Sequence, residues 1–326
     1  MTVVVTGAAG FIGFHVAAAL LDRGQAVVGV DNLNDYYPVS LKHARLAQLE
    51  GRPGWRFVTA DISDHEAVEA IFAGLEQVEG VVHLAAQAGV RYSLVNPYAY
   101  IQSNVMGQVA MLEAARRRPE NPHFVYASSS SVYGGNAKLP FSVDDRVDEP
   151  VSVYAATKKA DELLTAAYTH LYDLPATGLR FFTVYGPWGR PDMAPCLFAD
   201  AIAAGRPIRV FNHGRMKRDF TYIDDIVRGV LAALDRPPPA DAGGKAHRVF
   251  NLGNNNAEEL TRFIELIEQA LGRKAIMQME PMQPGDVPAT YADIEASRRE
   301  LGFEPSVALD VGIPRFIDWY RAYHQL

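Results

Sequence analysis

Short β-branched segments alternate with helical patterns from the first residues of the chain, and this alternation limits the possible folds more than any other feature. The strand candidates and the helical patterns between them are 2–7, 11–24, 26–31, 55–61, 63–74, 80–86, 97–118, 123–129, 151–174 and 176–186. Alternating strand and helix units predict a parallel sheet with helices on both faces. The strand candidates are continuously apolar, as is typical of sheets that are buried on both sides. We therefore predict an α/β fold with a doubly wound parallel sheet.

After about Gly186 the regular alternation ends, and proline and glycine become frequent. The remaining patterns predict one strand at 248–253 and helices at 194–204, 224–235, 257–271 and 309–323. We interpret this part as a smaller α/β domain built on the end of the first. Residues 1–180 would then form the sheet domain and residues 181–326 the smaller domain, and the chain is expected to cross between the two within residues 220–255.

The composition argues against several classes of partner. The formal net charge of −7 is unsuited to nucleic acid, because phosphate binding needs a basic surface. No apolar run reaches the roughly 18 to 20 residues that span a bilayer, so no membrane association is expected. The nine histidines form neither an HExxH motif nor a pairing with cysteine, so we predict no metal site. The single cysteine, Cys196, excludes an internal disulfide and fits the reducing cytoplasm; we interpret it as a packing residue.

Three glycines separate the first strand candidate from the first helical pattern. Gly7, Gly10 and Gly13 have the spacing GxxGxxG, which allows a tight turn, close approach of the backbone to a pyrophosphate and close packing of the helix. The amino terminus of the helix, at Phe11 and Ile12, offers N–H groups to the anion. A glycine triplet alone also fits a structural turn, but here a strand precedes it and a helix follows it. We predict that these five residues bind the pyrophosphate of a dinucleotide.

Residues at the ends of the following strand candidates extend this prediction. Asp31 ends the second one, 18 residues after Gly13, where a carboxylate accepts hydrogen bonds from ribose hydroxyls and repels a 2′-phosphate. Asn32 follows, and neither Arg nor Lys adjoins it in the sequence, so NAD is favoured over NADP. Asp61 can contact the adenine edge or cap its own loop, and the pattern does not distinguish the two. The expected cofactor site also includes Ile62, Leu84, Ala85 and Ala86.

A tyrosine and a lysine lie four positions apart in the helical pattern at 151–174. Tyr154 and Lys158 therefore share one face of the helix, where the ammonium group can stabilise a phenolate and the pair can act as a general base. On its spacing alone, the pair is more typical of an ordinary helix surface. The serine run 128–131 changes this interpretation, because it ends the fifth strand candidate, and doubly wound sheets bind ligands at the carboxyl ends of their strands. We predict a Ser–Tyr–Lys catalytic site.

The chain resembles the extended short-chain dehydrogenase/reductases over nearly its whole length. The resemblance rests on TGAAGFIG (6–13), the aspartate after the second strand, HLAA (83–86), SSSSVYG (128–134) and YxxxK. It implies a Rossmann-type NAD domain followed by a domain that binds nucleotide sugars. It also implies that Tyr154 is the catalytic base, that Lys158 holds the nicotinamide ribose and that Ser129 bonds the reacting hydroxyl. Relatives that dehydrate or decarboxylate nucleotide sugars usually have an acid where this chain has Ser130 and Ser131, which argues against both reactions.

Three later segments, 181–194, 210–225 and 283–287, closely resemble UDP-glucuronate 4-epimerases. Thr183 stands where galactose epimerases have Asn. Arg190 is expected to bind the sugar carboxylate through a bidentate ion pair, although by itself it also fits a surface arginine in a Pro/Gly loop. The other sugar-nucleotide contacts that the resemblance implies are Ser129, Ser130, Ser131, Tyr154, Val210, Phe211, Arg218 and Asp286.

The resemblance implies 4-epimerisation of UDP-glucuronate to UDP-galacturonate. Tyr154 would take the proton of the C4 hydroxyl while NAD accepts the hydride. The 4-keto sugar would then rotate and present its opposite face before it is reduced again. The alternatives are epimerisation of UDP-N-acetylglucuronate or UDP-glucose, net NAD-dependent oxidation or decarboxylation, and NAD sensing without catalysis. The resemblance also implies a homodimer, with the helical patterns at 97–118 and 153–172 as the interface.

Overall fold

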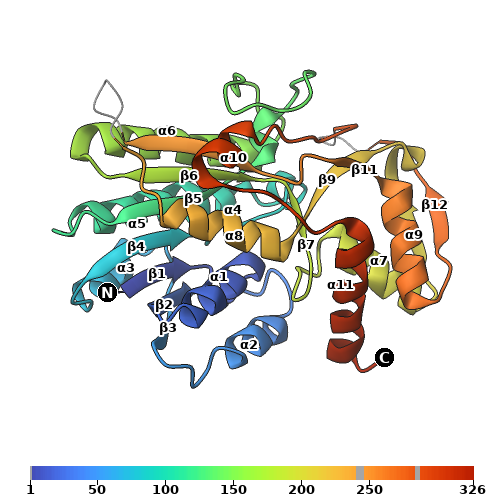
Figure 1. Ribbon diagram of the computed structural model, residues 1–326, viewed down its shortest axis with the longest axis horizontal. Coiled ribbons are helices and arrows are strands. Elements are labelled where there is room, and N and C mark those ends of the chain that lie inside the picture. The colour runs from blue at the N-terminus through green and yellow to red at the C-terminus, as the bar shows by residue number, and fades with distance from the viewer. Residues whose placement is uncertain (1, 240–245, 283–286) are drawn as a thin grey trace.

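A computed structural model describes residues 2–239, 246–282 and 287–326 of the chain (Figure 1). Its main element is a seven-stranded sheet with the strand order β10-β6-β5-β4-β1-β2-β3, in which every neighbouring pair is parallel. The strands are β1 (Thr2–Thr6), β2 (Ala26–Asp31), β3 (Trp55–Thr59), β4 (Val78–His83), β5 (His123–Ser129), β6 (Ala176–Phe181) and β10 (His247–Leu252). The predicted α/β fold with a doubly wound parallel sheet is confirmed.

Helices cover both faces of this sheet. They include α1 (Phe11–Asp22), α3 (His65–Ala73), α5 (Gly107–Arg116), α6 (Val153–Tyr172) and α8 (Ile223–Leu234). A further helix, α2 (Val39–Ala47), lies at the end of β2 instead. Successive residues of a strand point to opposite faces, so Val3 and Val5 of β1 belong to one hydrophobic core and Val4 belongs to another. α1 and α8 contact each other in the first core, whereas α3 and α5 contact each other in the second. Each strand of the sheet centre is thus buried on both sides, as its apolar sequence indicates.

The helix predicted at 97–118 is interrupted. It consists of α4 (Pro97–Tyr100), a π-helical turn at Ile101–Met106 and α5. Within the turn, the buried Asn104 bonds through its amide group to the backbone of Gln87 and, at 3.0 Å, to the hydroxyl of Thr157 on α6. Turns of this kind often occur at functional sites. Here the turn fixes the segment after β4 against α6.

The smaller part of the fold contains two further sheets. β7 (Thr183–Tyr185), β9 (Lys217–Tyr222) and β11 (Ala257–Glu259) form one, and β8 (Pro207–Val210) and β12 (Ile276–Met279) form the other. This part also contains the helices α7 (Ala194–Ala203), α9 (Leu260–Leu271), α10 (Glu295–Leu301) and α11 (Leu309–His324).

Two sequence expectations for the smaller part are wrong in detail. The strand predicted at 176–186 divides at Phe182, because β6 pairs with β5 and β10 whereas β7 pairs with β9 in a different sheet. The helix predicted at 257–271 begins at Leu260, because the three preceding residues form β11.

Within the described ranges, no helix combines the length and the apolar character that crossing a membrane requires.

Asp219 on β9 connects several loops of the smaller part. The residue is fully buried, and its carboxylate accepts hydrogen bonds from the backbone N–H groups of Asn254, Asn255 and Ala292 at 2.5, 3.1 and 3.0 Å.

After β9 the chain returns along the large sheet through α8 and β10, and β10 pairs with β6. The two parts of the fold are therefore connected by several passages of the chain.

Candidate active site

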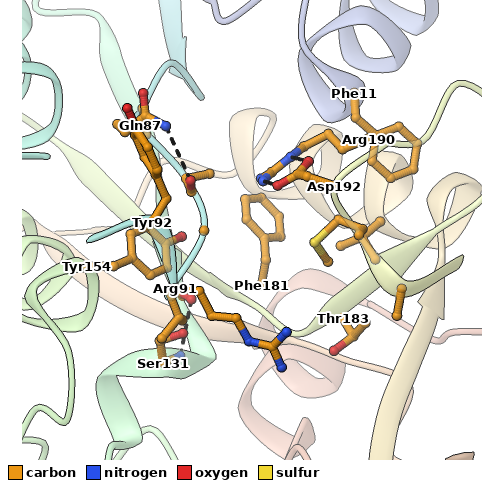
Figure 2. A pocket seen from close by; sticks show the side chains of 18 of the residues that line it. Phe11, Gln87, Arg91, Tyr92, Ser131, Tyr154, Phe181, Thr183, Arg190 and Asp192 are labelled. Carbon is orange, nitrogen blue, oxygen red and sulfur yellow. Dashed lines mark hydrogen bonds and ion pairs between the residues drawn. The ribbon is translucent and has the colours of Figure 1, made fainter. Parts of the chain in front are cut away.

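A cavity of about 940 Å³ lies at the carboxyl ends of strands of the large sheet and extends to the smaller part of the fold (Figure 2). Residues that follow β1, β2, β4, β5 and β6 line it, as expected for the ligand site of a doubly wound sheet. Of the predicted site residues in the described ranges, all except Asp61 and Val210 line this cavity. Asp286 lies outside the described residues.

The glycine loop after β1 forms one wall as bare backbone. Gly7 has a φ of +69°, and a Cβ on it would lie 2.8 Å from the backbone nitrogen of Ala85. A Cβ on Gly13 would lie 2.1 Å from the carbonyl oxygen of Gly7. Gly10 caps α1 without a side chain, so the N–H groups of the first helical turn, at Phe11 and Ile12, are accessible to an anion. This loop fits the pyrophosphate of NAD, because any side chain at Gly7 or Gly13 would disturb it.

Asp31 ends β2 at the edge of the same cavity. Its carboxylate accepts hydrogen bonds from the backbone N–H groups of Ala9 (3.2 Å) and Leu33 (2.9 Å), which fix its orientation. Lys42 of α2 lies 3.6 Å from Asp31 Oδ1, so the expectation that no basic residue accompanies this aspartate holds in the sequence but not in space. Burial lowers the pKa of Lys42, whereas Asp31 opposes the shift. The carboxylate still disfavours a 2′-phosphate, and Lys42 weakens that repulsion.

Asp61 caps its own loop. Its Oδ1 accepts hydrogen bonds from the backbone and the hydroxyl of Ser63, at 2.9 and 2.7 Å, and its Oδ2 accepts one from Asn32 at 2.9 Å. Burial favours the neutral acid, but these bonds outweigh it and lower the pKa of Asp61. The neighbouring Ile62 lines the cavity and Asp61 does not, so the geometry favours a loop cap over a contact with adenine.

The predicted catalytic residues come together at the ends of β5 and α6. Ser129 ends β5 and caps the next turn, Ser130–Tyr133, by accepting a hydrogen bond from the backbone N–H of Ser131. Tyr154 lies in the first turn of α6, where Ser152 caps the helix by accepting from the N–H of Ala155. Figure 2 shows Tyr154 and Ser131 on the same side of the cavity. The cap and the strand end thus place a phenol and a row of serine hydroxyls at one cavity.

Lys158 lies one turn after Tyr154 on the cavity side of α6. Its side chain is 3% exposed, and its ammonium group donates to the carbonyl oxygen of Ala127 (2.9 Å) and to Asp161 Oδ2 (3.0 Å). The position fits the general-base arrangement, because an ammonium group one helical turn away stabilises a phenolate.

Arg190 faces the predicted catalytic residues from the other side of the cavity, together with Thr183 and Phe181 (Figure 2). It is not a surface arginine, because its side chain is 19% exposed and pairs with Asp192, with Nε 3.0 Å from Oδ1. Although burial opposes it, Asp192 raises the pKa of Arg190, so the guanidinium keeps its charge. Tyr36 donates a hydrogen bond to the same carboxylate at 3.2 Å, and burial and Asp192 raise its pKa to about 12.

The segment after β8 contributes one of the two predicted contacts. Val210 is fully buried at the end of β8 and does not line the cavity, so its predicted contact with a sugar nucleotide stays a prediction. Phe211 does line it, and the guanidinium groups of Arg91 and Arg209 lie 4.7 and 5.1 Å from its ring centroid. Arg218 also lines this end and donates to the carbonyl oxygen of Lys217.

Sequence reasoning missed several lining residues after β4, among them Gln87, Arg91 and Tyr92. The signal was available, because they follow a strand of the parallel sheet just as the serine run follows β5. It also missed the fully buried Arg45 of α2, which donates to the carbonyl oxygens of Ala9 (2.8 Å) and Trp188 (2.7 Å). Arg45 thereby joins the glycine loop to the loop that carries Arg190.

Cys196 and the metal-ligating types of side chain give no sign of a second centre in the described part of the chain. Cys196 is buried in α7, and burial raises the pKa of its thiol to about 12, as suits a packing residue. Within the part of the chain that the structure describes, no group of three His, Cys, Asp or Glu side chains could hold a metal ion.

Comparison with known proteins identifies the family. Residues 3–253 match the model of the NAD dependent epimerase/dehydratase family. A protein from Rhizobium meliloti named probable UDP-glucuronate 4-epimerase is 49% identical, over 98% of this chain and 97% of its own length. UDP-glucuronate 4-epimerase 4 of Arabidopsis thaliana is 50% identical, over 99% of this chain and 76% of its own length.

Solved structures give the same result. The crystal structure of UDP-glucuronic acid 4-epimerase from Bacillus cereus, in complex with UDP-glucuronic acid and NAD, superposes with a TM-score of 0.90 at 33% identity and covers 99% of this chain and 100% of that one. The family match and these relatives show that the chain belongs to the NAD dependent epimerase/dehydratase family.

Proposed function

We propose that the protein is an NAD-dependent 4-epimerase that interconverts UDP-glucuronate and UDP-galacturonate. The observation that carries the proposal is the pairing of two groups across one cavity, with Tyr154, Lys158 and the serines on one side and the charged Arg190 with Thr183 on the other. The first group suits proton transfer at a sugar hydroxyl, and the second suits a sugar carboxylate. The relatives named UDP-glucuronate 4-epimerase support this substrate.

The residues of the glycine loop would hold the cofactor. Gly7, Gly10 and Gly13 give the pyrophosphate a backbone surface, Asp31 accepts from the adenosine ribose and Lys158 donates to the nicotinamide ribose. When bound, NAD supplies a hydride acceptor that later returns the hydride to the same carbon. The chain itself must therefore supply orientation, proton transfer and exclusion of water.

Tyr154 performs the proton transfer in this proposal. As the phenolate it takes the proton from the C4 hydroxyl, and as the phenol it returns the proton to the C4 oxygen of the 4-keto sugar after the sugar has turned over. Ser129 and Ser131 hold that oxygen by hydrogen bonds, and Lys158 stabilises the phenolate. Ser130 and Ser131 offer no carboxylic acid to a departing hydroxyl, in agreement with epimerisation rather than dehydration.

Arg190 has a second task in the proposal. A 4-keto uronic acid is a β-keto acid that readily loses CO₂, so its carboxylate must be held in a pose that resists decarboxylation. A planar guanidinium can bind the carboxylate with two parallel hydrogen bonds, and Thr183 can add a third. Asp192 and Tyr36 hold the guanidinium in place while the sugar turns.

Product analysis tests the proposal directly. The purified protein is incubated with UDP-glucuronate, UDP-glucose or their N-acetyl analogues, without added NAD, and the products are resolved by NMR. Conversion of UDP-glucuronate to its C4 epimer, with no accumulation of NADH absorbance, is the expected result. Accumulation of NADH would show a net oxidoreductase, and a folded protein that retains NAD but converts none of the sugars would be a sensor.

We further propose that the protein is a homodimer. Large apolar side chains are exposed on neighbouring elements, including Tyr98 (83% exposed) on α4, Ile101 (53%) on the π-helical turn and Leu163 (60%) on α6. An exposed apolar surface of this kind is typical of an interface. Leu163→Glu should produce a monomer in sedimentation experiments, whereas Val311→Glu, which charges an exposed position on α11, should leave the dimer intact.

The division of the chain and its location complete the proposal. Residues 1–180 serve as the NAD-binding domain and residues 181–326 as the nucleotide-sugar-binding domain, with the chain crossing between them in 220–255. The single, buried cysteine suits the reducing cytoplasm. Limited proteolysis with and without a UDP-sugar tests the division, because protection by the sugar should concentrate in the second segment.

A further inference from the structure

A buried carboxylate accompanies Lys158 on α6. Asp161 is fully buried, and its Oδ2 accepts the hydrogen bond from Lys158 Nζ at 3.0 Å. Its Oδ1 has no hydrogen-bond partner among the residues that the structure describes. A buried carboxylate that is only half satisfied is unfavourable, and burial raises the pKa of Asp161 to about 6. A packing role alone would be better served by an uncharged side chain.

The charged neighbours of Asp161 have partners of their own. Glu162, the next residue on α6, pairs with Arg180 of β6 at 2.8 Å and accepts from the hydroxyl of Ser128 at 2.6 Å. Lys159 points to Glu162, with its Nζ 3.4 Å from Oε2. In the described part of the chain, the ammonium of Lys158 is therefore the cation in contact with Asp161.

The other facing groups are neutral. Tyr126 of β5 bonds to His247 of β10 at 3.0 Å, and burial, Glu162 and Asp161 together raise the pKa of its phenol. Burial lowers the pKa of His247 to about 4 and that of His83 on β4, which feels the charge of Lys158, to about 3. From the π-helical turn and α5, Asn104 and Gln108 face α6 and bond to Thr157 and Thr165.

We infer that Asp161 is a positioning residue that fixes Lys158 and limits how strongly its positive charge acts on Tyr154. The inference rests on the proposed function and deepens it. Of the three protons of Lys158 Nζ, the carbonyl oxygen of Ala127 and the carboxylate of Asp161 accept two, which leaves the third for a ligand in the cavity. Asp161 lies seven residues after Tyr154, two turns along the same helix, so its negative charge opposes the field of Lys158 at the phenol.

This arrangement suits a residue that must both take and return a proton. An unopposed lysine would favour the phenolate so strongly that the return of the proton would be impeded. The carboxylate reduces that preference, and its hydrogen bond also fixes the position of Lys158. Removing a nearby negative charge favours deprotonation of every neighbouring group. Both limbs of the pH profile should therefore move to lower pH when the charge is removed.

The test is the pH dependence of kcat/KM for the full-length protein with UDP-glucuronate. Asp161→Asn keeps the shape and an acceptor for Lys158 but removes the charge, and both limbs should move to lower pH by roughly half a unit or more. Asp144→Asn removes the same charge from an exposed loop position and should reproduce the wild-type profile. A profile of Asp161→Asn that superposes on the wild type, or moves to higher pH, would overturn the inference. A purely structural role would lower the rate at all pH values without moving the limbs.

A second measurement needs no substrate. The ultraviolet absorbance of tyrosinate, taken as the difference between each protein and its Tyr154→Phe counterpart, reports the ionisation of Tyr154 directly. This titration should shift to lower pH in Asp161→Asn and also in Asp161→Ser, a smaller uncharged variant that serves if the first folds poorly. If the wild type epimerises none of the sugars, the proposed function fails, but the absorbance titration still decides the role of Asp161. An unchanged titration in an active enzyme refutes the inference alone.

Discussion

The two sides of the cavity are built in different ways. On the cofactor side, the candidate residues directly follow strands of one sheet, as Gly7 follows β1 and Ser129 ends β5. On the sugar side, Arg190 lies in a loop whose geometry depends on Asp192 and Tyr36, and on Arg45, which holds the backbone of Trp188. The first side is fixed by the sheet itself. The second is fixed by individual polar contacts, which makes it the side where substrate preference can change without loss of the fold.

Tyr154 belongs to the cofactor side but acts on the sugar, so its removal should have the largest effect. Tyr154→Phe deletes the proton acceptor while keeping the ring, which contacts Tyr100 edge-on at 6.0 Å. Epimerisation should fall by about 10³-fold, within the range for loss of a general base. Product NMR measures the rate, and the amount of NAD that remains bound after purification shows whether the cofactor side is intact. Turnover at the wild-type rate would refute the mechanism.

The glycine loop offers a way to break the cofactor side alone. Gly13→Ala places a methyl group 2.1 Å from the carbonyl oxygen of Gly7, so the loop must move. We expect a loss of about 3 kcal/mol in the free energy of unfolding, at the upper end of the usual cost of overpacking, together with loss of bound NAD. Chemical denaturation and the absorbance of released NAD measure the two effects.

Gly135→Ala is the matched control, because nothing lies within 4 Å of a Cβ at that position. It should change neither the stability nor the NAD content by a measurable amount. If Gly13→Ala behaves in the same way, the loop is more adaptable than its geometry indicates, and the contrast between a rigid and an adaptable side is wrong.

This contrast also explains what the sequence could predict. The strands, the glycine loop and the order of sheet and helix were predictable because each depends on local properties: apolar runs, positive φ at Gly7 and helix spacing. The same holds for Ser129, Tyr154 and Lys158, since strand ends and helix turns place them without reference to distant residues. Their lining of one cavity follows from the doubly wound topology.

Contacts that depend on tertiary packing were not predictable. Lys42 reaches Asp31 only because α2 lies across the end of β2, and no local pattern gives that distance. The two readings of Asp61 differ in whether Ser63 and Asn32 turn toward it, which only coordinates decide. The division of the strand at Phe182 depends likewise on pairing partners, since neither Gly nor Pro interrupts the sequence between Leu179 and Tyr185.

Arg190 tests the sugar side. Arg190→Ala should raise KM for UDP-glucuronate by about 10- to 100-fold, as loss of a charge-assisted hydrogen bond implies, and should increase the share of decarboxylated product. Binding of UDP-glucose, which lacks the carboxylate, should change far less. Steady-state kinetics and product NMR separate these effects.

Arg146→Ala provides the control, because Arg146 also pairs with an aspartate two residues later, Asp148, but is exposed. Its kinetics should match those of the wild type. An Arg190→Ala variant with unchanged turnover and unchanged products would show that another group binds the carboxylate, and Arg91 would be the next candidate because it lines the same cavity.

The smallest expected effect is the response of the buried histidines and aspartates to acid. Burial lowers the pKa of four histidines, to about 4 for His15, His123 and His247 and to about 3 for His83. In the unfolded chain these histidines have the usual pKa of 6.5, so the unfolded chain takes up their protons at a higher pH than the folded protein does. The contribution of the buried histidines to stability is therefore complete above pH 6.5 and is lost as pH falls toward 4. Burial raises the pKa of Asp219, on the sugar side, and the pKa of Asp161 to about 6. Proton uptake by these two carboxylates in the folded protein therefore stabilises it as pH falls through the lower part of that range.

His123 on β5 isolates the first contribution, because its ring bonds to the carbonyl oxygen of Leu234 and the hydroxyl of Thr177, at the end of β5 opposite to Ser129. In His123→Gln the fall of the unfolding free energy between pH 6.5 and pH 4 should be shallower by at most about 1.4 kcal/mol per pH unit, the value for one proton. His65→Gln, at an exposed position at the start of α3, should keep the wild-type slope. Equal slopes in all three proteins would mean that His123 gains its proton while the protein stays folded. The cofactor side would then be less rigid than its packing implies.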